Sequence, residues 1–151
     1  MSRVKVAIDV CIPQRLVRLL QTGFGDLGYE FIYEAEFAAA NAADEFWAGA
    51  FRRFGGAVIL SADKNIGRRL HQIRAFQEND LICFFCDSRW AGTDLAFKLA
   101  HMVYWWPHIH QHLANCEPRD CWWIPMNVSP APFRKIIIPA EKLQAKVAKT
   151  K

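Results

Sequence analysis

At 151 residues, the chain is long enough to bury a core as one domain without disulfides or a structural metal. Its content of 52% apolar and 23% charged residues excludes a disordered chain and is typical of a globular one. The formal net charge of +4 is mild, so it permits a nucleic-acid partner without requiring one.

No apolar run approaches the roughly 18 residues that a membrane helix needs, and no secretory signal follows Met1. We therefore expect a soluble, cytoplasmic protein with no membrane partner, in which the five cysteines are reduced thiols. Residues 1–140 form the predicted domain, and the lysine-rich residues 141–151 form a predicted flexible, basic tail.

Apolar and β-branched runs alternate along the chain with segments of helical spacing. The runs predict strands at residues 4–8, 29–33, 57–60, 81–86, 121–124 and 134–138. The helical spacing predicts helices at residues 13–22, 44–54, 66–74 and 93–112, the last of which Pro107 should kink or break. Strands that are apolar throughout and joined by helices indicate a parallel sheet. The predicted fold is an α/β, doubly wound, mainly parallel sheet covered by helices on both faces.

Acidic residues directly follow three of these strands, namely Asp9, Asp63 and Asp87. Ligands of open α/β sheets bind beyond the carboxyl ends of the strands, where the winding reverses. In a 2-1-3-4 strand order, Asp9 and Asp63 would lie about one strand spacing apart, roughly 5 Å. Asp44, at the start of a predicted helix, could approach the same rim. Carboxylates this close repel unless a cation lies between them, which favours Mg²⁺ or Mn²⁺. The alternative is that these acids are solvated loop residues and helix caps.

Three segments of the chain resemble PIN-like domains related to VapC-type toxins. They are the strand, acid and proline-started helix at residues 6–20, Glu36 ahead of the Asp44-Glu45 helix start, and the strand and acid at residues 58–66. The resemblance spans roughly residues 4–90 and implies a ribonuclease that uses Mg²⁺ or Mn²⁺ and is often paired with an antitoxin protein. It implies as metal-binding acids Asp9, Glu36, Asp44 and Asp63.

Two positions depart from the family pattern. Cys11 stands where a polar residue is more usual, and Asn65 replaces the second aspartate of an Asp-x-Asp loop. Asn65 still offers a carbonyl oxygen, so it remains a predicted metal ligand, with Asp87 as a further, outer acid. Glu34 is an alternative to Glu36, because strand alternation would put both side chains on the same side.

Basic residues follow two of the aspartates that end predicted strands, Asp63 and Asp87. Lys64, Arg68 and Arg69 come after Asp63, and Arg89 comes after Asp87. Lysine and arginine contacts to phosphates supply most sequence-independent affinity for nucleic acids, so these four residues are the predicted RNA contacts. The alternative is a solvated helix face.

Cys83 and Cys86 resemble half of a zinc site, but residues three apart on a strand point to opposite faces, so core cysteines are favoured. The histidines near Pro107, with Cys116 and Cys121 after them, match no standard zinc spacing. The dense aromatic residues late in the chain favour core packing or a homodimer surface over stacking on RNA bases.

These observations favour a PIN-like endoribonuclease, the toxin of a toxin–antitoxin pair, in which Asp9, Asp44 and Asp63 are the catalytic acids. Its expected partners are RNA, an antitoxin protein and a second copy of the chain. One rival is a PIN-like scaffold without activity that serves only for binding or dimerisation, which Cys11 and Asn65 support. Another is a phosphotransfer domain resembling receiver or haloacid dehalogenase domains, although a haloacid dehalogenase needs a second aspartate where Cys11 stands.

Overall fold

The computed structural model describes residues 3–36, 44–66, 70–127 and 133–138. Six strands form one sheet in the order β2-β1-β3-β4-β5-β6. Their bounds are β1 Val4–Ile8, β2 Tyr29–Tyr33, β3 Gly56–Ser61, β4 Ile82–Cys86, β5 Cys121–Ile124 and β6 Arg134–Lys135. Neighbouring strands from β2 to β5 run parallel, and β6 runs antiparallel to β5. The prediction of a mainly parallel α/β sheet is confirmed.

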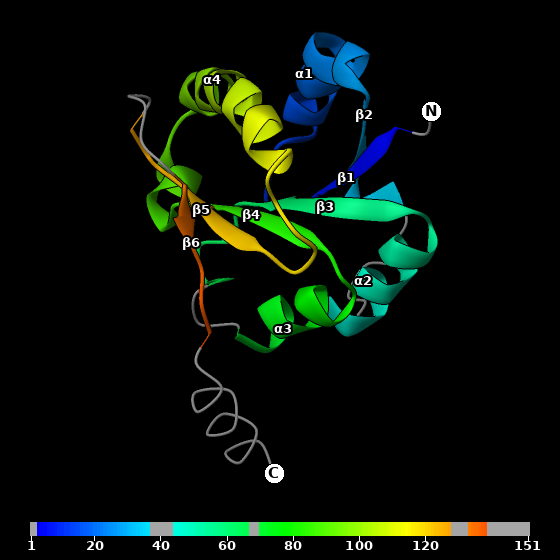
Figure 1. Cartoon of the computed structure of the whole chain (residues 1–151). Coiled ribbons are helices and arrows are strands. Elements are labelled where there is room, and N and C mark those ends of the chain that lie inside the picture. The colour runs from blue at the N-terminus through cyan, green and yellow to red at the C-terminus, as the bar shows by residue number, and fades with distance from the viewer. Residues whose placement is uncertain (1–2, 37–43, 67–69, 128–132, 139–151) are drawn as a thin grey trace.

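Helices cover both faces of this sheet. The α-helices are α1 Gln14–Phe24, α2 Asp44–Arg53, α3 Leu70–Glu78 and α4 Leu95–Leu113, and the 3-10 turns are η1 Gly25–Leu27, η2 Glu34–Glu36 and η4 Ser88–Gly92. Figure 1 shows α1 and α4 above the sheet and α2 and α3 below it. Because the chain winds outward from β1 to β2 and then returns past β1 to β3, the winding reverses between β1 and β3. Among the described helices, none combines the length and apolar content that crossing a membrane requires.

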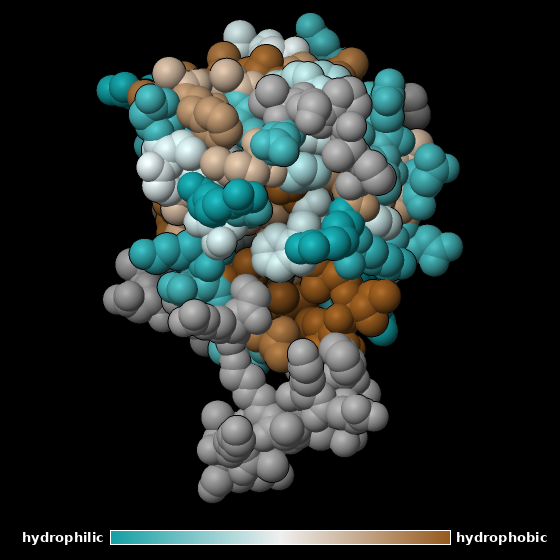
Figure 2. Space-filling view, turned by 90° about the vertical axis from the view of Figure 1, so that its left-hand side faces the viewer, coloured by the Kyte–Doolittle hydropathy of each residue, from teal (hydrophilic) through white to brown (hydrophobic). Residues whose placement is uncertain are grey.

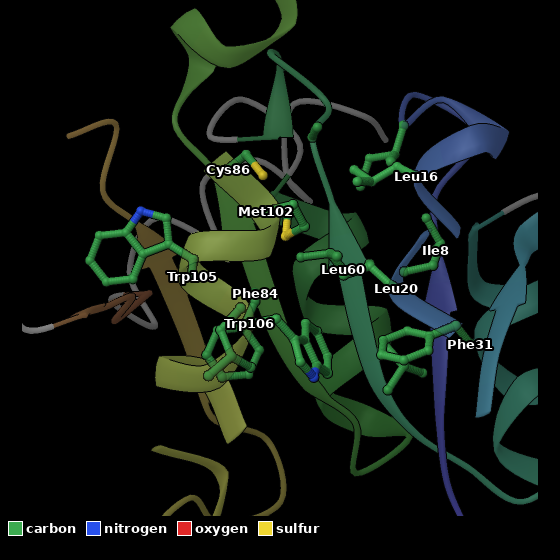
Figure 3. Packing of buried hydrophobic residues seen from close by; sticks show 14 of the residues in the cluster. Ile8, Leu16, Leu20, Phe31, Leu60, Phe84, Cys86, Met102, Trp105 and Trp106 are labelled. Atoms are coloured by element: carbon green, nitrogen blue, oxygen red, sulfur yellow. The ribbon is translucent and has the colours of Figure 1, made fainter. Parts of the chain in front are cut away.

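Two apolar layers fill the space between the sheet and its helices. Successive residues of a strand point to opposite faces. Ile8 and Leu60 therefore pack in the layer with α1 and α4, whereas Ala7 packs in the layer with α2 and α3. Figure 3 shows the first layer, in which Trp106 lies beside Phe31 with the ring centroids 4.8 Å apart.

The same alternation separates the two cysteines of β4. Cys83 is buried in the layer with α2 and α3, and Cys86 is buried in the layer with α1 and α4. The prediction of core cysteines on opposite faces is confirmed. Core packing is likewise confirmed for Trp105 and Trp106, because each is no more than 1% exposed.

Pro107 does not break α4, so that part of the prediction is wrong. The helix continues for six residues beyond it, to Leu113. A proline inside a helix deprives the carbonyl four residues earlier, here that of Val103, of its usual donor. Both Val103 and Pro107 are on the exposed side of α4, where water can hydrogen-bond to that carbonyl. Trp106 and Ile109, fully buried on either side of Pro107, hold the helix on the sheet.

β6 is shorter than the strand predicted at residues 134–138. Its partner β5 begins at Cys121, whose carbonyl accepts a hydrogen bond from the Ile136 amide, so β5 offers no pairing position beyond Ile136. Ile137 follows with 78% of its surface exposed. Figure 2 faces this edge of the molecule and shows apolar surface beside polar side chains. The helix predicted at residues 66–74 begins, within the described residues, at Leu70.

Replacing Trp106 with alanine should lower the free energy of unfolding by about 3–5 kcal/mol, because the side chain is fully buried against Tyr29 and Phe31. Denaturant unfolding at neutral pH measures this loss. Val103→Ala, on the exposed side of the same helix, is the control and should change stability by less than about 0.5 kcal/mol. Equal effects of the two substitutions would contradict the packing described here.

Candidate active site at the carboxyl edge of the sheet

The carboxyl ends of β1 and β3 bring two aspartates to one edge of the sheet. Ile8 pairs with Leu60, and the amide of Asp9 donates to the Leu60 carbonyl at 3.0 Å. Asp9 therefore lies beside Ser61, the last residue of β3. Asp63 follows two residues later. The two aspartates are only 7% and 9% exposed, respectively.

Ser61 connects these two aspartates. Its hydroxyl donates to Oδ2 of Asp9 at 2.6 Å and accepts a hydrogen bond from the Asp63 amide at 3.3 Å. A buried carboxylate is costly unless it is hydrogen-bonded, and a bond to a charged acceptor is stronger than one between neutral groups. Ser61 thus gives the buried Asp9 side chain a hydrogen-bond partner where the winding of the sheet reverses.

Each aspartate also orients the loop that follows it. Oδ1 of Asp9 accepts from the Cys11 amide at 3.1 Å, and Oδ1 of Asp63 accepts from the Asn65 amide at 2.9 Å. Such bonds to the amide two residues on are typical of Asx turns. A carboxylate has about four lone-pair sites, so both aspartates keep acceptor capacity for a cation. The bond between Asn65 and Asp63 uses the backbone of Asn65 and not its side-chain amide.

Glu34 approaches the loop after Asp9, whereas Glu36 does not make this contact. Oε2 of Glu34 accepts from the Val10 amide at 3.1 Å, and Glu36 is exposed. β2 ends at Tyr33, and both glutamates lie in the 3-10 turn η2, so strand alternation does not describe this pair. Glu34 is therefore the better placed of the two predicted candidates.

The pKa of the Cys11 thiol reflects the acidic residues around it. Partial burial, followed by the negative charges of Asp9 and Asp63, raises the pKa of this thiol to about 12, and Glu34 adds a smaller effect of the same sign. Although the residue is exposed as a whole, its thiol stays protonated at neutral pH. Because a thiolate is the reactive form, Cys11 is not a nucleophile here.

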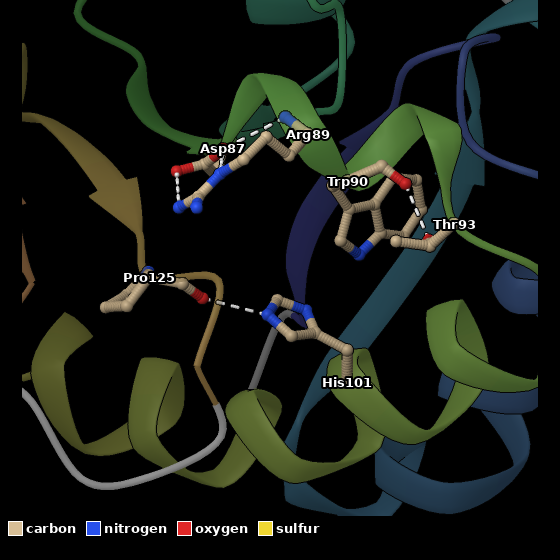
Figure 4. A network of polar contacts seen from close by, with 6 residues as sticks. All are labelled: Asp87, Arg89, Trp90, Thr93, His101 and Pro125. Atoms are coloured by element: carbon tan, nitrogen blue, oxygen red, sulfur yellow. Dashed lines mark hydrogen bonds and ion pairs between the residues drawn. The ribbon is translucent and has the colours of Figure 1, made fainter.

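Asp87 lies one strand further along the same edge. Ser61 pairs with Phe85, so Asp63 and Asp87 lie equally far beyond their paired residues. The Asp87 carboxylate binds the Arg89 guanidinium through two bonds of 2.9 and 3.0 Å, as Figure 4 shows. The hydrogen bond from the Arg89 side chain lowers the pKa of Asp87. In this arrangement the predicted outer acid and one predicted RNA contact neutralise each other.

A cleft of about 640 Å³ opens beyond the ends of β3, β4 and β5. Asp63 and Lys64 contribute to it from the end of β3, and Asp87 and Arg89 contribute from the end of β4. Arg134 closes it from β6. Lys64, Arg89 and Arg134 are all exposed, so the cationic side chains that line the cleft are accessible to an anionic ligand.

Some predicted site residues lie outside the described part of the chain. Arg68 and Arg69 do, and so does the side chain of Asp44, whose backbone begins α2. Within the described residues, no group of three or more histidine, cysteine, aspartate or glutamate side chains is arranged to hold a metal ion. The described acids alone therefore do not close around a cation.

The histidines near Pro107 point to separate partners. Nδ1 of His110 lies 2.6 Å from the Tyr29 hydroxyl, whereas the ring of His112 packs edge-on against Trp122 with centroids 4.3 Å apart. The Cys116 thiol donates to the carbonyl of His112 at 3.3 Å. The first two contacts pack this segment against β2 and β5, and the third lies within the segment.

His101 fixes the loop that follows β5. Its Nε2 lies 2.8 Å from the carbonyl oxygen of Pro125, a residue that lines the cleft (Figure 4). A carbonyl oxygen can only accept, so Nε2 carries the proton. Burial lowers the pKa of His101, which keeps the ring neutral at neutral pH. The fully buried His101 side chain of α4 thus anchors one wall of the cleft.

Three residues of the site went unrecognised in the sequence. Ser61 directly precedes the Asp63 loop, and the register of β1 and β3 would have placed it opposite Asp9. Arg134 carries no comparable signal, because its position depends on how the short β6 pairs with β5. His101 carries no local signal, since its role depends on a loop 24 residues away.

Comparison with known families identifies the first part of the chain. A family model described as "PIN like domain" matches residues 4–88, which is more than half of the chain. The matched segment runs from β1 through β4 and contains Asp9, Asp63 and Asp87. Searches of curated proteins and of solved structures found no match.

Replacing Ser61 with alanine should lower the free energy of unfolding by about 1.5–3 kcal/mol, because a buried carboxylate loses its hydroxyl donor. Denaturant unfolding of Ser61→Ala, Asp9→Asn and the double variant isolates the pairwise coupling. Ser88→Ala, at an exposed position of the same edge, is the control. Additive effects of the first two substitutions would show that the bond contributes nothing.

The stability of the protein should decrease as the pH falls from 7 to 5. An unfolded histidine titrates near 6.5, whereas burial keeps the folded pKa of His101 below that value. Below about pH 6.5 the unfolded state therefore binds more protons than the folded state. The stability that the neutral His101 ring contributes is then lost as the pH falls toward the lowered pKa of the folded protein. Aspartates with lowered pKa values, such as Asp87, stay ionised throughout this window. Unfolding curves of wild type and His101→Gln at both pH values test this, and equal pH slopes would contradict it.

Proposed function

The chain belongs to the PIN-like domain family, and we propose that it is a metal-dependent ribonuclease that cleaves RNA phosphodiesters. The observation that carries the proposal is the Ser61 bridge, which holds the buried carboxylate of Asp9 beside the Asp63 loop. Ionised carboxylates gathered where the winding of an open α/β sheet reverses favour the binding of a cationic ligand.

The chemistry of these donors fits Mg²⁺ or Mn²⁺, which prefer oxygen ligands. Asp9, Asp63 and Glu34 would hold the ion, together with Asp44 and the Asn65 side chain. Once bound, the ion would supply Lewis acidity and offset negative charge at the phosphate. Glu34 enters this set in preference to Glu36 because of its bond to the Val10 amide.

The remaining residues of the edge would orient the substrate. Ser61 holds the Asp9 carboxylate in place through its hydrogen bond of 2.6 Å. Lys64, exposed and next to Asp63, would offset charge that develops on the phosphate, and the cleft beyond it would receive the adjoining RNA. Arg89 would contribute to phosphate binding through the guanidinium face that Asp87 does not occupy.

We also propose a biological setting, a cytoplasmic toxin of the VapC type that an antitoxin protein inhibits. The opening strand, acid and proline-started helix support this, since they resemble that group of toxins. A second copy of the chain is the proposed partner at β6, because β6 is an edge strand of the sheet and Ile137 beside it is 78% exposed.

The second candidate function is a PIN-like binding module without catalytic activity. Two observations favour it. No group of three or more metal-binding side chains forms within the described residues, and Cys11 and Asn65 depart from the family pattern. Such a module would keep the fold and the cleft but would not need to bind Mn²⁺.

Metal-dependent cleavage should disappear when the acids are neutralised. We expect Asp9→Asn and Asp63→Asn to reduce cleavage of a labelled, structured RNA by about 100-fold or more in Mg²⁺ or Mn²⁺. Wild type should be inactive in EDTA. Asp26→Asn, an exposed aspartate of η1 near the opposite end of β2, is the matched control and should cleave normally.

Calorimetric titration with Mn²⁺ separates the two candidate functions. Binding by wild type that Asp9→Asn weakens supports the ribonuclease. Neither binding nor cleavage by wild type would refute the ribonuclease and leave the binding module.

A further inference from the structure

The cleft beside Asp63 combines cationic side chains with a half-buried aromatic ring, and neither belongs to the acidic cluster. Trp123 and Met126 line it from β5 and the loop that follows, and Arg134 lines it from β6. All three residues lie beyond residue 88, where the match to the PIN-like family ends. This wall of the cleft is therefore a feature of this chain that the matched family segment does not contain.

We propose that the cleft is a nucleotide subsite, in which one base packs on Trp123 while its phosphate lies between Arg134 and Arg89. The proposal rests on the proposed function to the extent that this nucleotide would be one unit of the RNA being cleaved. Binding of a free nucleotide needs neither the metal nor cleavage.

The pairing of β5 with β6 places Trp123 and Arg134 side by side. Trp123 pairs with Arg134 across the antiparallel strands, so the two side chains point to the same face of the sheet. That face is the one with α2 and α3, because Trp123 packs against Phe85 with ring centroids 6.0 Å apart. Trp123 is half-buried, so its indole is both held in position and open to the cleft.

Charge favours a phosphate at the Arg134 end of the cleft. Asp87 already binds Arg89, and the hydrogen bond from Arg89 lowers the pKa of Asp87. The positive charge of Arg134 lowers the same pKa by a smaller amount. Arg134 therefore lies close to the Asp87–Arg89 pair, but it makes no ion pair within the described ranges. Arg89 and Arg134 both line the cleft, and Asp87 pairs with Arg89, so Arg134 offers a positive charge to a second anion. Arginine binds phosphate through paired N–H donors.

Size and shape fit a single nucleotide. The volume of about 640 Å³ falls within the roughly 300–1,000 Å³ of typical small-ligand sites. Stacking of a base on an aromatic side chain is favourable for every base, so Trp123 would support binding without selecting a sequence. His101 holds the Pro125 wall through its bond of 2.8 Å, so this part of the cleft is formed before the ligand arrives. Asp63 lines the same cleft, so the RNA unit next to the bound nucleotide would lie at the acidic edge of the sheet.

The test measures by calorimetry how tightly the full chain binds AMP, CMP, GMP and UMP in EDTA. We expect all four to bind, and we expect Arg134→Ala to weaken binding by about tenfold or more through loss of a charged hydrogen bond. Trp123→Leu should weaken binding comparably, and Trp123→Phe should restore most of it. Lys135→Ala is the matched control, because Lys135 is the next residue of β6 but faces Trp122 and Asp120 on the other side.

The outcomes distinguish this inference from the ribonuclease proposal. Nucleotide binding that persists in Asp9→Asn, while cleavage is lost, supports a separate subsite. Equal affinity of wild type, Arg134→Ala and Trp123→Leu overturns the subsite, whether or not the protein cleaves RNA. Inorganic phosphate binding as tightly as the nucleotides overturns the contact between base and Trp123. Denaturant unfolding of each variant confirms that a loss of binding does not reflect a loss of folding.

Discussion

The parallel pairing of β1 with β3 is the constraint on which the rest of this edge depends. Asp9 reaches Ser61 only because Ile8 is in register with Leu60 and the chain returns past β1 after β2. The buried carboxylate of Asp9 would be costly without the hydroxyl of Ser61 and the amide of Cys11. The same bonds orient the carboxylate, so the contacts that make its burial tolerable also fix its direction at this edge of the sheet.

The sequence predicted the elements well where burial alone decides them. Strands covered on both faces must be apolar throughout, and this pattern located β1 to β5 and the acids that follow β1, β3 and β4. It predicted less well where one local contact decides. Tyr33 ends β2, so the turn η2 and not strand alternation determines that Glu34, rather than Glu36, reaches the Val10 amide. Pro107 failed as a helix breaker because buried tryptophan packing outweighs one lost backbone bond.

Residues that act through distant partners were the hardest to recognise. Arg134 has no neighbouring motif, and its place follows from antiparallel pairing of a two-residue strand. Arg89 was predicted as an RNA contact from its charge, but its guanidinium also binds the carboxylate of Asp87. A charged residue after a strand can therefore either bind a ligand or pair with a neighbouring side chain. Only the positions of its neighbours show which of its donors remain for a ligand.

The carboxyl edge of the sheet changes character along its length. Near β1 and β3 it gathers buried carboxylates, which attract a cation, and near β4 to β6 it gathers Arg89, Arg134 and the indole of Trp123. A nucleic-acid strand has the complementary composition, with phosphates that need both a cation at one position and arginine donors at the next, and bases that need an apolar face. The matched family segment ends at Ser88 and contributes the acids, whereas the strands after it contribute Trp123 and Arg134. If the two ends serve one ligand, chemistry and substrate positioning reside in different parts of the chain, and the second can change without disturbing the first.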